Sequence, residues 1–295
     1  MADSSAQFGV VVGVDGSQES GAALRWAARE AQLFGMPLTV VYIIAPTVVT
    51  WPMVPLQDTV AQCQRENAEE TLSRARTEVL SMAAASGQGI EVRTEVRYSS
   101  VLPALVEVSK DAQLVVVGSR GMGTVSRLVL GSVSDGLLHH AHGPVTVVHT
   151  KGGRLPDASA PVVVGIDGSP VSEAATAVAF DEAARRRVDL VTVHVWSDSS
   201  GLPLQGRAWR DQKQYAEEVL AERLAGWQEQ YPDVRIHRHV EFDEPARHLI
   251  GKSCAAQLVV LGSHGRGGFS GMLLGSVSSA VAHSVDIPVT VVRPR

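Results

Sequence analysis

The chain has 295 residues, which is enough for two domains at a usual size of roughly 150 residues each. Hydrophobic residues make up 45% and charged residues 19%, a composition typical of a folded globular protein. The net charge of −5 argues against general electrostatic binding, so we expect neither nucleic acid nor an anionic membrane as a partner.

The apolar stretches and the cysteines indicate the cellular compartment in which the protein is expected. The N-terminal residues lack a basic segment before an apolar one, and the longest apolar run, residues 38–49, contains Thr, Tyr and Pro. We therefore expect neither a signal peptide nor membrane insertion. Cys63 and Cys254 lie far apart without a partner at metal-ligand spacing, so a cytoplasmic location is expected.

The chain contains the same sequence blocks twice, in the same order. Residues 10–17 (VVVGVDGS) match residues 162–169 (VVVGIDGS) at seven of eight positions. Three later blocks, at 113–119, 129–134 and 144–148, recur 144 residues further on. These repeats indicate a tandem duplication.

Short β-branched runs alternate with longer helical patterns in both copies. In copy one we expect strands near 8–14, 37–44, 90–97, 113–118 and 144–149, with helices near 18–34, 57–85, 102–111 and 132–141. In copy two we expect strands near 161–166, 189–195, 234–240, 257–262 and 288–293. This alternation indicates βαβ units and a parallel sheet buried on both faces.

The predicted fold class is α/β, with two tandem doubly wound five-stranded parallel-sheet domains. We place domain 1 at 1–151 and domain 2 at 160–295, joined by a linker of Gly, Pro and polar residues at about 151–160. Such sheets bind ligands in a crevice at the carboxyl ends of the strands, where the strand order reverses.

Glycine-rich loops follow the fourth predicted strand of each copy. Gly118-x2-Gly121 precedes Gly131-Ser132 by nine residues, and Gly262-x2-Gly265 precedes Gly275-Ser276 in the same way. Glycine allows close backbone approach, and Gly-Ser at a helix start offers N–H groups to a phosphate. Such turns and caps also occur without a ligand, but their duplication favours phosphate binding.

An aspartate ends the first predicted strand of each copy, at Asp15 and Asp167. Its carboxylate could accept hydrogen bonds from ribose hydroxyls or help to hold Mg²⁺. The alternative is an N-cap or Asx-turn, which Asp forms routinely at such positions.

Together these residues resemble the ATP-binding branch of the universal stress protein family, as a tandem member of the mycobacterial and actinobacterial type. The resemblance covers nearly the whole chain. It implies a Rossmann-like, three-layer α/β/α domain with strand order 3-2-1-4-5, and one ATP held in each domain between the first and fourth strands.

The resemblance also implies which residues contact the nucleotide. The aspartate would contact ribose, the loop glycines, the serine and the next backbone group would contact ribose and phosphates, and backbone after the second strand would hold adenine. In copy one these residues are Asp15, Ile43, Gly118, Gly121, Gly131, Ser132 and Val133. In copy two they are Asp167, Val195, Gly262, Gly265, Gly275, Ser276 and Val277.

The glycine-rich loops contain basic side chains, and one position departs from the family pattern. Arg127 and Arg266 are favoured over Arg120 and His264 as groups that neutralise phosphate. Where the family often has His before the adenine position, copy one has Tyr42, which leaves the local packing there open.

Three classes of function compete. A regulator that binds ATP as a ligand explains the paired loops without a nucleophile, a His–base pair or a metal cluster. An ATPase would lack a G-x4-G-K-[ST] loop, so at most slow hydrolysis is expected. A dehydrogenase would need G-x-G-x-x-G after the first strand, which residues 13–17 do not supply. Cyclic AMP stays open as an alternative ligand.

The repeated PVTVV segments end each copy and are expected to form edge strands, which must be paired or covered. The family resemblance implies that the copies pair through these strands and that whole chains form a homodimer. A protein partner is also expected, but the sequence does not name it.

Overall fold

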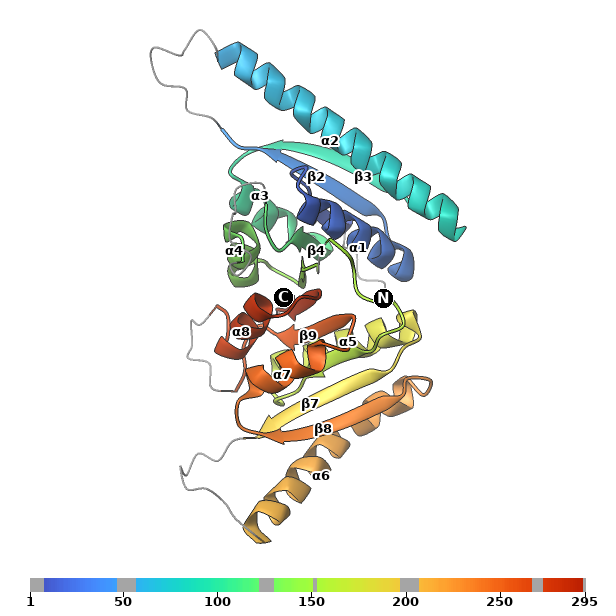
Figure 1. Ribbon diagram of the computed structural model, residues 1–295, viewed down its shortest axis with the longest axis vertical. Helices are drawn as coiled ribbons and strands as arrows, with labels where there is room; N and C mark the ends of the chain where they lie inside the picture. Colours follow the sequence, from blue (N-terminus) through green and yellow to red (C-terminus); the bar gives the residue numbers. More distant parts are fainter. Residues whose placement is uncertain are drawn as a thin grey trace. The chain divides into compact units, whose positions relative to one another are not determined.

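The computed structural model describes residues 8–46, 57–121, 130–150, 153–196, 207–266 and 273–293. Contacts within it divide the chain into two compact units, with the boundary between Arg154 and Leu155. Each unit is an α/β domain, so the predicted fold class of two tandem doubly wound domains is confirmed (Figure 1).

Unit 1 contains a five-stranded parallel sheet. Its strands are β1 (Gly9–Gly13), β2 (Leu38–Ile44), β3 (Val92–Tyr98), β4 (Ala112–Gly118) and β5 (Val145–Val148). They lie in the order β3-β2-β1-β4-β5, which confirms the order that the family resemblance implies. The central strand is fully buried, with Val10, Val11 and Val12 at 1% exposure or less.

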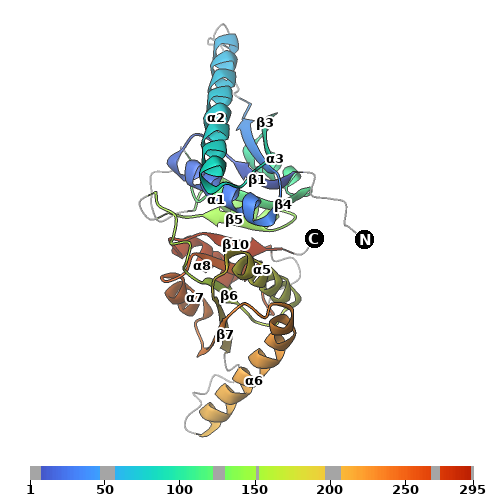
Figure 2. The same cartoon turned by 90° about the vertical axis from the view of Figure 1, so that its right-hand side faces the viewer.

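Helices cover both faces of this sheet. They are α1 (Gln18–Phe34), α2 (Gln57–Ser86), α3 (Val101–Val108) and α4 (Ser132–His140). Helix α1 packs on β1 and β4, and α2 packs on β2 and β3, whereas α3 contacts α4 and β2. Figure 1 shows α1 and α2 on one face, with α3 and α4 on the other, and Figure 2 shows α1 and α2 in front of the sheet.

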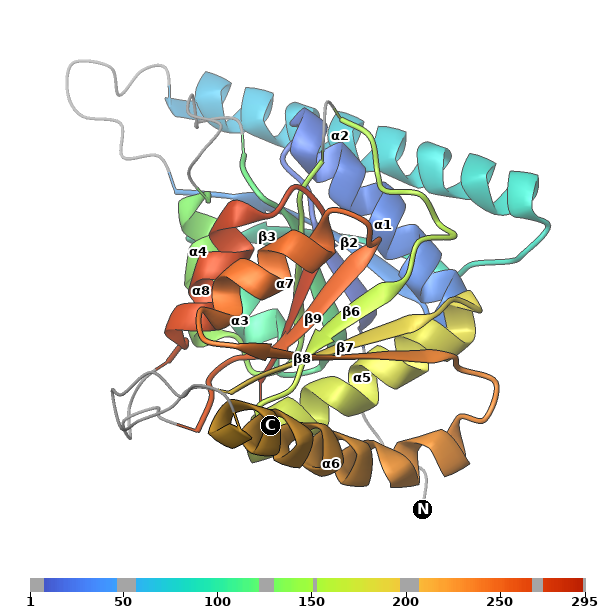
Figure 3. The ribbon, with the colours of Figure 1, turned by 60° about the horizontal axis from the view of Figure 1, so that its bottom comes forward.

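Unit 2 repeats this architecture. Its strands are β6 (Val162–Gly165), β7 (Leu190–Trp196), β8 (Ile236–Phe242), β9 (Leu258–Gly262) and β10 (Val289–Val292), in the order β8-β7-β6-β9-β10. Its helices are α5 (Pro170–Arg186), α6 (Arg207–Gln230), α7 (Pro245–Ser253) and α8 (Ser276–Ser284). Helices α7 and α8 lie on one face of this sheet, and α5 and α6 on the other (Figure 3).

The first helix of each unit begins where the sequence places a serine after Asp-Gly. Ser17 caps α1 by accepting a hydrogen bond from the N–H of Ser20 at 3.1 Å, and Ser169 caps α5 in the same way. Helix α1 ends at Gly35, whose φ of 63° is a left-handed conformation that glycine adopts without strain. The serine caps fix the path from the carboxyl end of the first strand into its helix.

Candidate functional site

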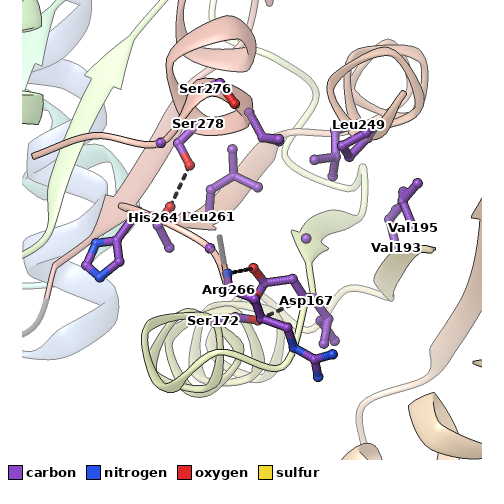
Figure 4. A pocket seen from close by; sticks show the side chains of 17 residues that line it. Asp167, Ser172, Val193, Val195, Leu249, Leu261, His264, Arg266, Ser276 and Ser278 are labelled. Carbon is purple, nitrogen blue, oxygen red and sulfur yellow. Dashed lines mark hydrogen bonds between the residues drawn. The ribbon is translucent and has the colours of Figure 1, made fainter. Parts of the chain in front are cut away.

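A cavity lies at the carboxyl ends of the central strands in each unit. The chain leaves β1 for α1 on one face and leaves β4 for α4 on the opposite face, so their ends separate at a topological switch point. The cavity there measures about 390 Å³ in unit 1 and about 440 Å³ in unit 2. Figure 4 shows the side chains that line the unit 2 cavity. Both volumes suit a nucleotide-sized ligand.

Nearly all of the predicted site residues line these two cavities. In unit 1 they are Asp15, Ile43, Gly118, Gly121, Gly131, Ser132 and Val133. In unit 2 they are Asp167, Val195, Gly262, Gly265, Arg266, Gly275, Ser276 and Val277. Arg127 lies outside the described residues. Residues far apart in the sequence are therefore brought together at equivalent places in both units.

Sequence reasoning missed the apolar wall of each cavity. In unit 1 the additional apolar lining residues are Val14, Val41, Val101, Leu105 and Val117. In unit 2 they are Ile166, Val193, Pro245, Leu249 and Leu261. Strand alternation was a usable signal, because Val41 and Val193 lie two residues before the predicted adenine positions and so share their face. Such a wall can enclose a planar base.

The two aspartates form Asx-turns, as one of the alternatives predicted. Oδ1 of Asp15 accepts a hydrogen bond from the N–H of Ser17 at 2.9 Å, and Oδ1 of Asp167 accepts one from Ser169 at 2.9 Å. The N-cap itself is the serine and not the aspartate. Each carboxylate is thus held at the cavity by its own turn. A carboxylate oxygen has more than one lone pair and can accept more than one hydrogen bond.

The second oxygen of each aspartate meets the glycine loop of the neighbouring strand. Oδ2 of Asp167 accepts a hydrogen bond from the N–H of Arg266 at 3.1 Å (Figure 4). In unit 1, a Cβ placed on Gly121 would stand 2.6 Å from Oδ2 of Asp15. A side chain at Gly121 would therefore displace the carboxylate, and Gly265 is in the same position against Asp167.

The other loop glycines lie close to protein neighbours, most tightly at Gly118. A Cβ on Gly118 would lie 2.8 Å from the carbonyl carbon of Glu19, and a Cβ on Gly131 would lie 3.3 Å from Cα of Arg120. Gly262 lies similarly close to Val171 in unit 2. The sequence suggested that these glycines leave room for a ligand, but their nearest constraint is the packing of loop and helix backbones.

The helices that follow these loops begin without a side-chain cap. Gly131 and Gly275 are the N-caps of α4 and α8, and neither position provides a capping hydrogen bond from a side chain. The first backbone hydrogen bond of α4 runs from the N–H of Asp135 to the carbonyl oxygen of Gly131, at 2.9 Å. The three preceding N–H groups, at 132–134, are at the cavity edge. This arrangement favours a bound anion.

The two cavities differ in their charged groups. In unit 1, Nη2 of Arg120 lies 3.2 Å from Oε1 of Glu19, so this cation is already paired at the rim. His264 stands at the equivalent loop position in unit 2, where Nδ1 lies 3.0 Å from Oγ of Ser263. Unit 2 adds Arg266 to its lining. The unit 2 cavity is therefore the richer of the two in unpaired donor groups among the described residues.

The family departure at Tyr42 has a local explanation. His194 in unit 2 lies with Nδ1 2.7 Å from the carbonyl oxygen of Ile166, bridging β7 to the end of β6. Tyr42 in unit 1 instead accepts a hydrogen bond at its hydroxyl from Nδ2 of Asn67 on α2, at 3.2 Å. The substitution thus changes the contact between the second strand and its helix, on the face opposite to Ile43.

Two further properties concern the described part of the chain. None of its helices combines the length and the apolar character needed to cross a membrane. Within the same residues, no group of three or more His, Cys, Asp or Glu side chains is arranged to hold a metal ion.

Comparison with known proteins follows the same division into two units. A family model described as the Universal stress protein family matches residues 9–149 and 160–293. The chain is 54% identical to a universal stress protein of Mycolicibacterium smegmatis over 295 residues, covering 100% of both chains. It is 50% identical to one of Mycobacterium tuberculosis over 288 residues, covering 97% of each. A universal stress protein crystal structure from Archaeoglobus fulgidus matches in fold, with a TM-score of 0.69, 22% identity and 99% coverage of both chains.

Proposed function

Because the chain belongs to the universal stress protein family, we propose that it is a nucleotide-dependent regulator of stress response or growth that binds one ATP in each unit. One observation carries the proposal: the same cavity occurs twice, each with a turn-held aspartate, an apolar wall and an uncapped helix N-terminus. These three features match the three chemical parts of a nucleotide.

Each part has its own contacts in the proposal. The base lies against the apolar wall and meets the backbone near Ile43 or Val195. The ribose hydroxyls donate to Asp15 or Asp167, whose position is set by the Asx-turn. The phosphates accept hydrogen bonds from N–H groups at the start of α4 or α8, where the helix dipole also favours negative charge.

Mg²⁺ is a proposed companion of ATP and not a separately held metal. Both carboxylate oxygens of Asp167 already accept backbone N–H bonds, from Ser169 and Arg266. A Mg²⁺ ion that accompanied ATP would therefore take its ligands mainly from the phosphates and water, since it prefers to keep several waters.

The proposal assigns ATP the role of a bound signal. The lining residues supply hydrogen bonds and apolar contact, and a site that binds ground state and transition state equally gives affinity without turnover. Slow hydrolysis is the second candidate. Cyclic AMP is the alternative ligand, because its single phosphate also fits one helix N-terminus. The proposal further places the protein in the cytoplasm, as a homodimer acting on a protein partner.

Calorimetry on the purified full chain tests the proposal, using ATP, ADP, AMP, cyclic AMP and NAD as ligands. Mass spectrometry of any nucleotide that co-purifies identifies the ligand taken up in the cell. We expect ATP to bind at a stoichiometry near two per chain. Absence of adenine-nucleotide binding at millimolar ligand concentration contradicts the proposal.

A further inference from the structure

Two arginines of unit 2 meet at the turn that carries Asp167. Gly168, in this turn, has a φ of +78°, and its side-chain position is filled by the guanidinium of Arg223 and by Nη2 of Arg266. Arg223 comes from α6, and Arg266 comes from the loop after β9. Both cations thus adjoin one point beside the carboxylate of Asp167.

These like charges are incompletely neutralised. Among the described residues, Arg223 has one acidic partner, Glu173, at 3.6 Å, and the Glu173 side chain is 67% exposed. Nε of Arg223 is buried and makes no hydrogen bond with any described residue. The guanidinium of Arg266 has no ion pair within the described part of the chain. Neighbouring guanidiniums repel each other, and an anion between them would relieve the repulsion and use the spare donors.

Among the described residues, unit 1 lacks this arrangement at the equivalent turn. Gly16 has a φ of +87°, and the nearest atom to its side-chain position is Oγ1 of Thr71, at 3.7 Å. Thr71 lies on α2 at the position that corresponds to Arg223 on α6, because each side chain reaches the turn glycine of its own unit and the two are 152 residues apart, as the first sequence blocks are. The guanidinium at this helix position is therefore specific to unit 2.

Space is present beyond the arginine pair. A second cavity of about 710 Å³ lies on the α5 and α6 side of the sheet, and it shares Arg266 with the nucleotide cavity. Its lining includes His194, Trp196, Tyr215 and Arg223. The two cavities therefore meet at Arg266, beside the turn that carries Asp167.

We propose that unit 2 selects nucleotides that carry a phosphate on the ribose 2′ or 3′ hydroxyl, and that Arg223 and Arg266 bind this phosphate. The inference rests on the proposed function, which puts the ribose hydroxyls at Asp167. A phosphate on one of these hydroxyls extends from the carboxylate toward the two guanidiniums. The planar fork of a guanidinium matches phosphate oxygens, and in dinucleotide-binding folds an arginine near the ribose accommodates a 2′-phosphate.

The test compares AMP with adenosine 3′,5′-bisphosphate and adenosine 2′,5′-bisphosphate by calorimetry on the full chain. All measurements use an Asp15→Ala background, so that unit 2 gives the main signal. They are made at one low ionic strength, because salt screens partly exposed charges. We expect at least one bisphosphate to bind about tenfold or more tightly than AMP, since its added contacts are charge-assisted.

Three variants separate the arginine pair from the rest of the site. Arg223→Gln should remove the preference for the bisphosphate and leave the AMP affinity unchanged. Glu173→Gln should increase the preference, because it removes the carboxylate that competes for Arg223. Thr71→Ala, the matched change in unit 1, should alter neither value. Glu173 is largely exposed, so we expect Glu173→Gln to fold. This variant therefore tests the inference even if Arg223→Gln fails to fold.

The outcomes separate this inference from the proposed function. Equal affinity of unit 2 for AMP and both bisphosphates overturns the inference and leaves the proposed function standing. A preference that persists in Arg223→Gln, or that Glu173→Gln leaves unchanged, also overturns it. Loss of all binding, by ATP, AMP and bisphosphates alike, overturns both. Binding of a bisphosphate alone, sensitive to Arg223→Gln, supports the inference and contradicts ATP as the ligand of unit 2.

Discussion

The backbone N–H of Arg266 donates a hydrogen bond of 3.1 Å to Oδ2 of Asp167. This bond joins the loop that follows β9 to the turn that follows β6, so the two halves of the unit 2 cavity are held together by the aspartate. The carboxylate therefore has a structural role as well as the ribose contact that we propose. Its removal should affect both loop order and ligand affinity.

The aspartates should control the two sites separately. We expect a stoichiometry near two ATP per chain, falling to near one in Asp15→Ala or in Asp167→Ala, because each change removes the ribose acceptor of one unit. Each variant should weaken its own site by about tenfold or more, since one or more charge-assisted hydrogen bonds are lost. Calorimetry measures both quantities. A stoichiometry near one in the unaltered chain would mean that one unit has lost its binding function.

We expect Gly118 to be needed mainly for packing within unit 1. Gly118→Ala is expected to destabilise unit 1 by about 1–3 kcal/mol, because its new Cβ would lie 2.8 Å from the carbonyl carbon of Glu19. Gly226→Ala is the matched control: it lies inside α6 with no atom within 4 Å of the added Cβ, and should stabilise by about 0.5–1 kcal/mol. Urea unfolding distinguishes them. Equal stabilities of the two variants would contradict the packing argument.

ATP turnover should be slow. We expect single-turnover hydrolysis on homogeneous protein to stay well below about one per second, the lower end of ordinary enzyme rates. The physical reason is that the lining supplies hydrogen-bond donors and apolar contact that hold ground state and transition state alike, which gives affinity without turnover. Gly131→Ala, at the phosphate end of the proposed site, is the specificity control. A rate of about one per second or more that this variant abolishes would identify an enzyme.

Unit 2 should lose stability on acidification through His239. Burial, followed by the charge of Lys252, lowers the pKa of His239 from its usual 6.5, with His237 adding to this effect and Glu241 opposing it. The folded state therefore binds fewer protons than the unfolded state, and stability falls as the pH drops through 6.5 toward the lower folded value.

His239→Gln should reduce this acid sensitivity, measured as the difference in urea midpoints between about pH 7.5 and about pH 5. Lys252→Gln should reduce it in part, because Nζ of Lys252 lies 3.0 Å from Nδ1 of His239. An unchanged pH difference in both variants would show that His239 titrates alike in the folded and unfolded states.

Whole chains are expected to associate as homodimers, on the basis of the family resemblance. Light scattering on purified protein at micromolar concentration should then give a mass near twice the chain mass of 31.3 kDa. Dilution should shift this mass toward the monomer value, because association depends on concentration. A mass that stays near 31.3 kDa at every concentration contradicts the dimer.

The sequence alone determined the duplicated α/β fold and most of the candidate site. Strand and helix patterns are local, and residues such as Asp15 and Gly131 stand at predicted strand and helix ends, which parallel strands bring to one edge of the sheet. Only the tertiary structure revealed the contact of Gly118 with the backbone at Glu19, and the meeting of Arg223 with Arg266 at Gly168. These contacts join elements that are far apart in the sequence. A local pattern of residues does not encode the distance or direction at which separate helices and loops pack against one turn.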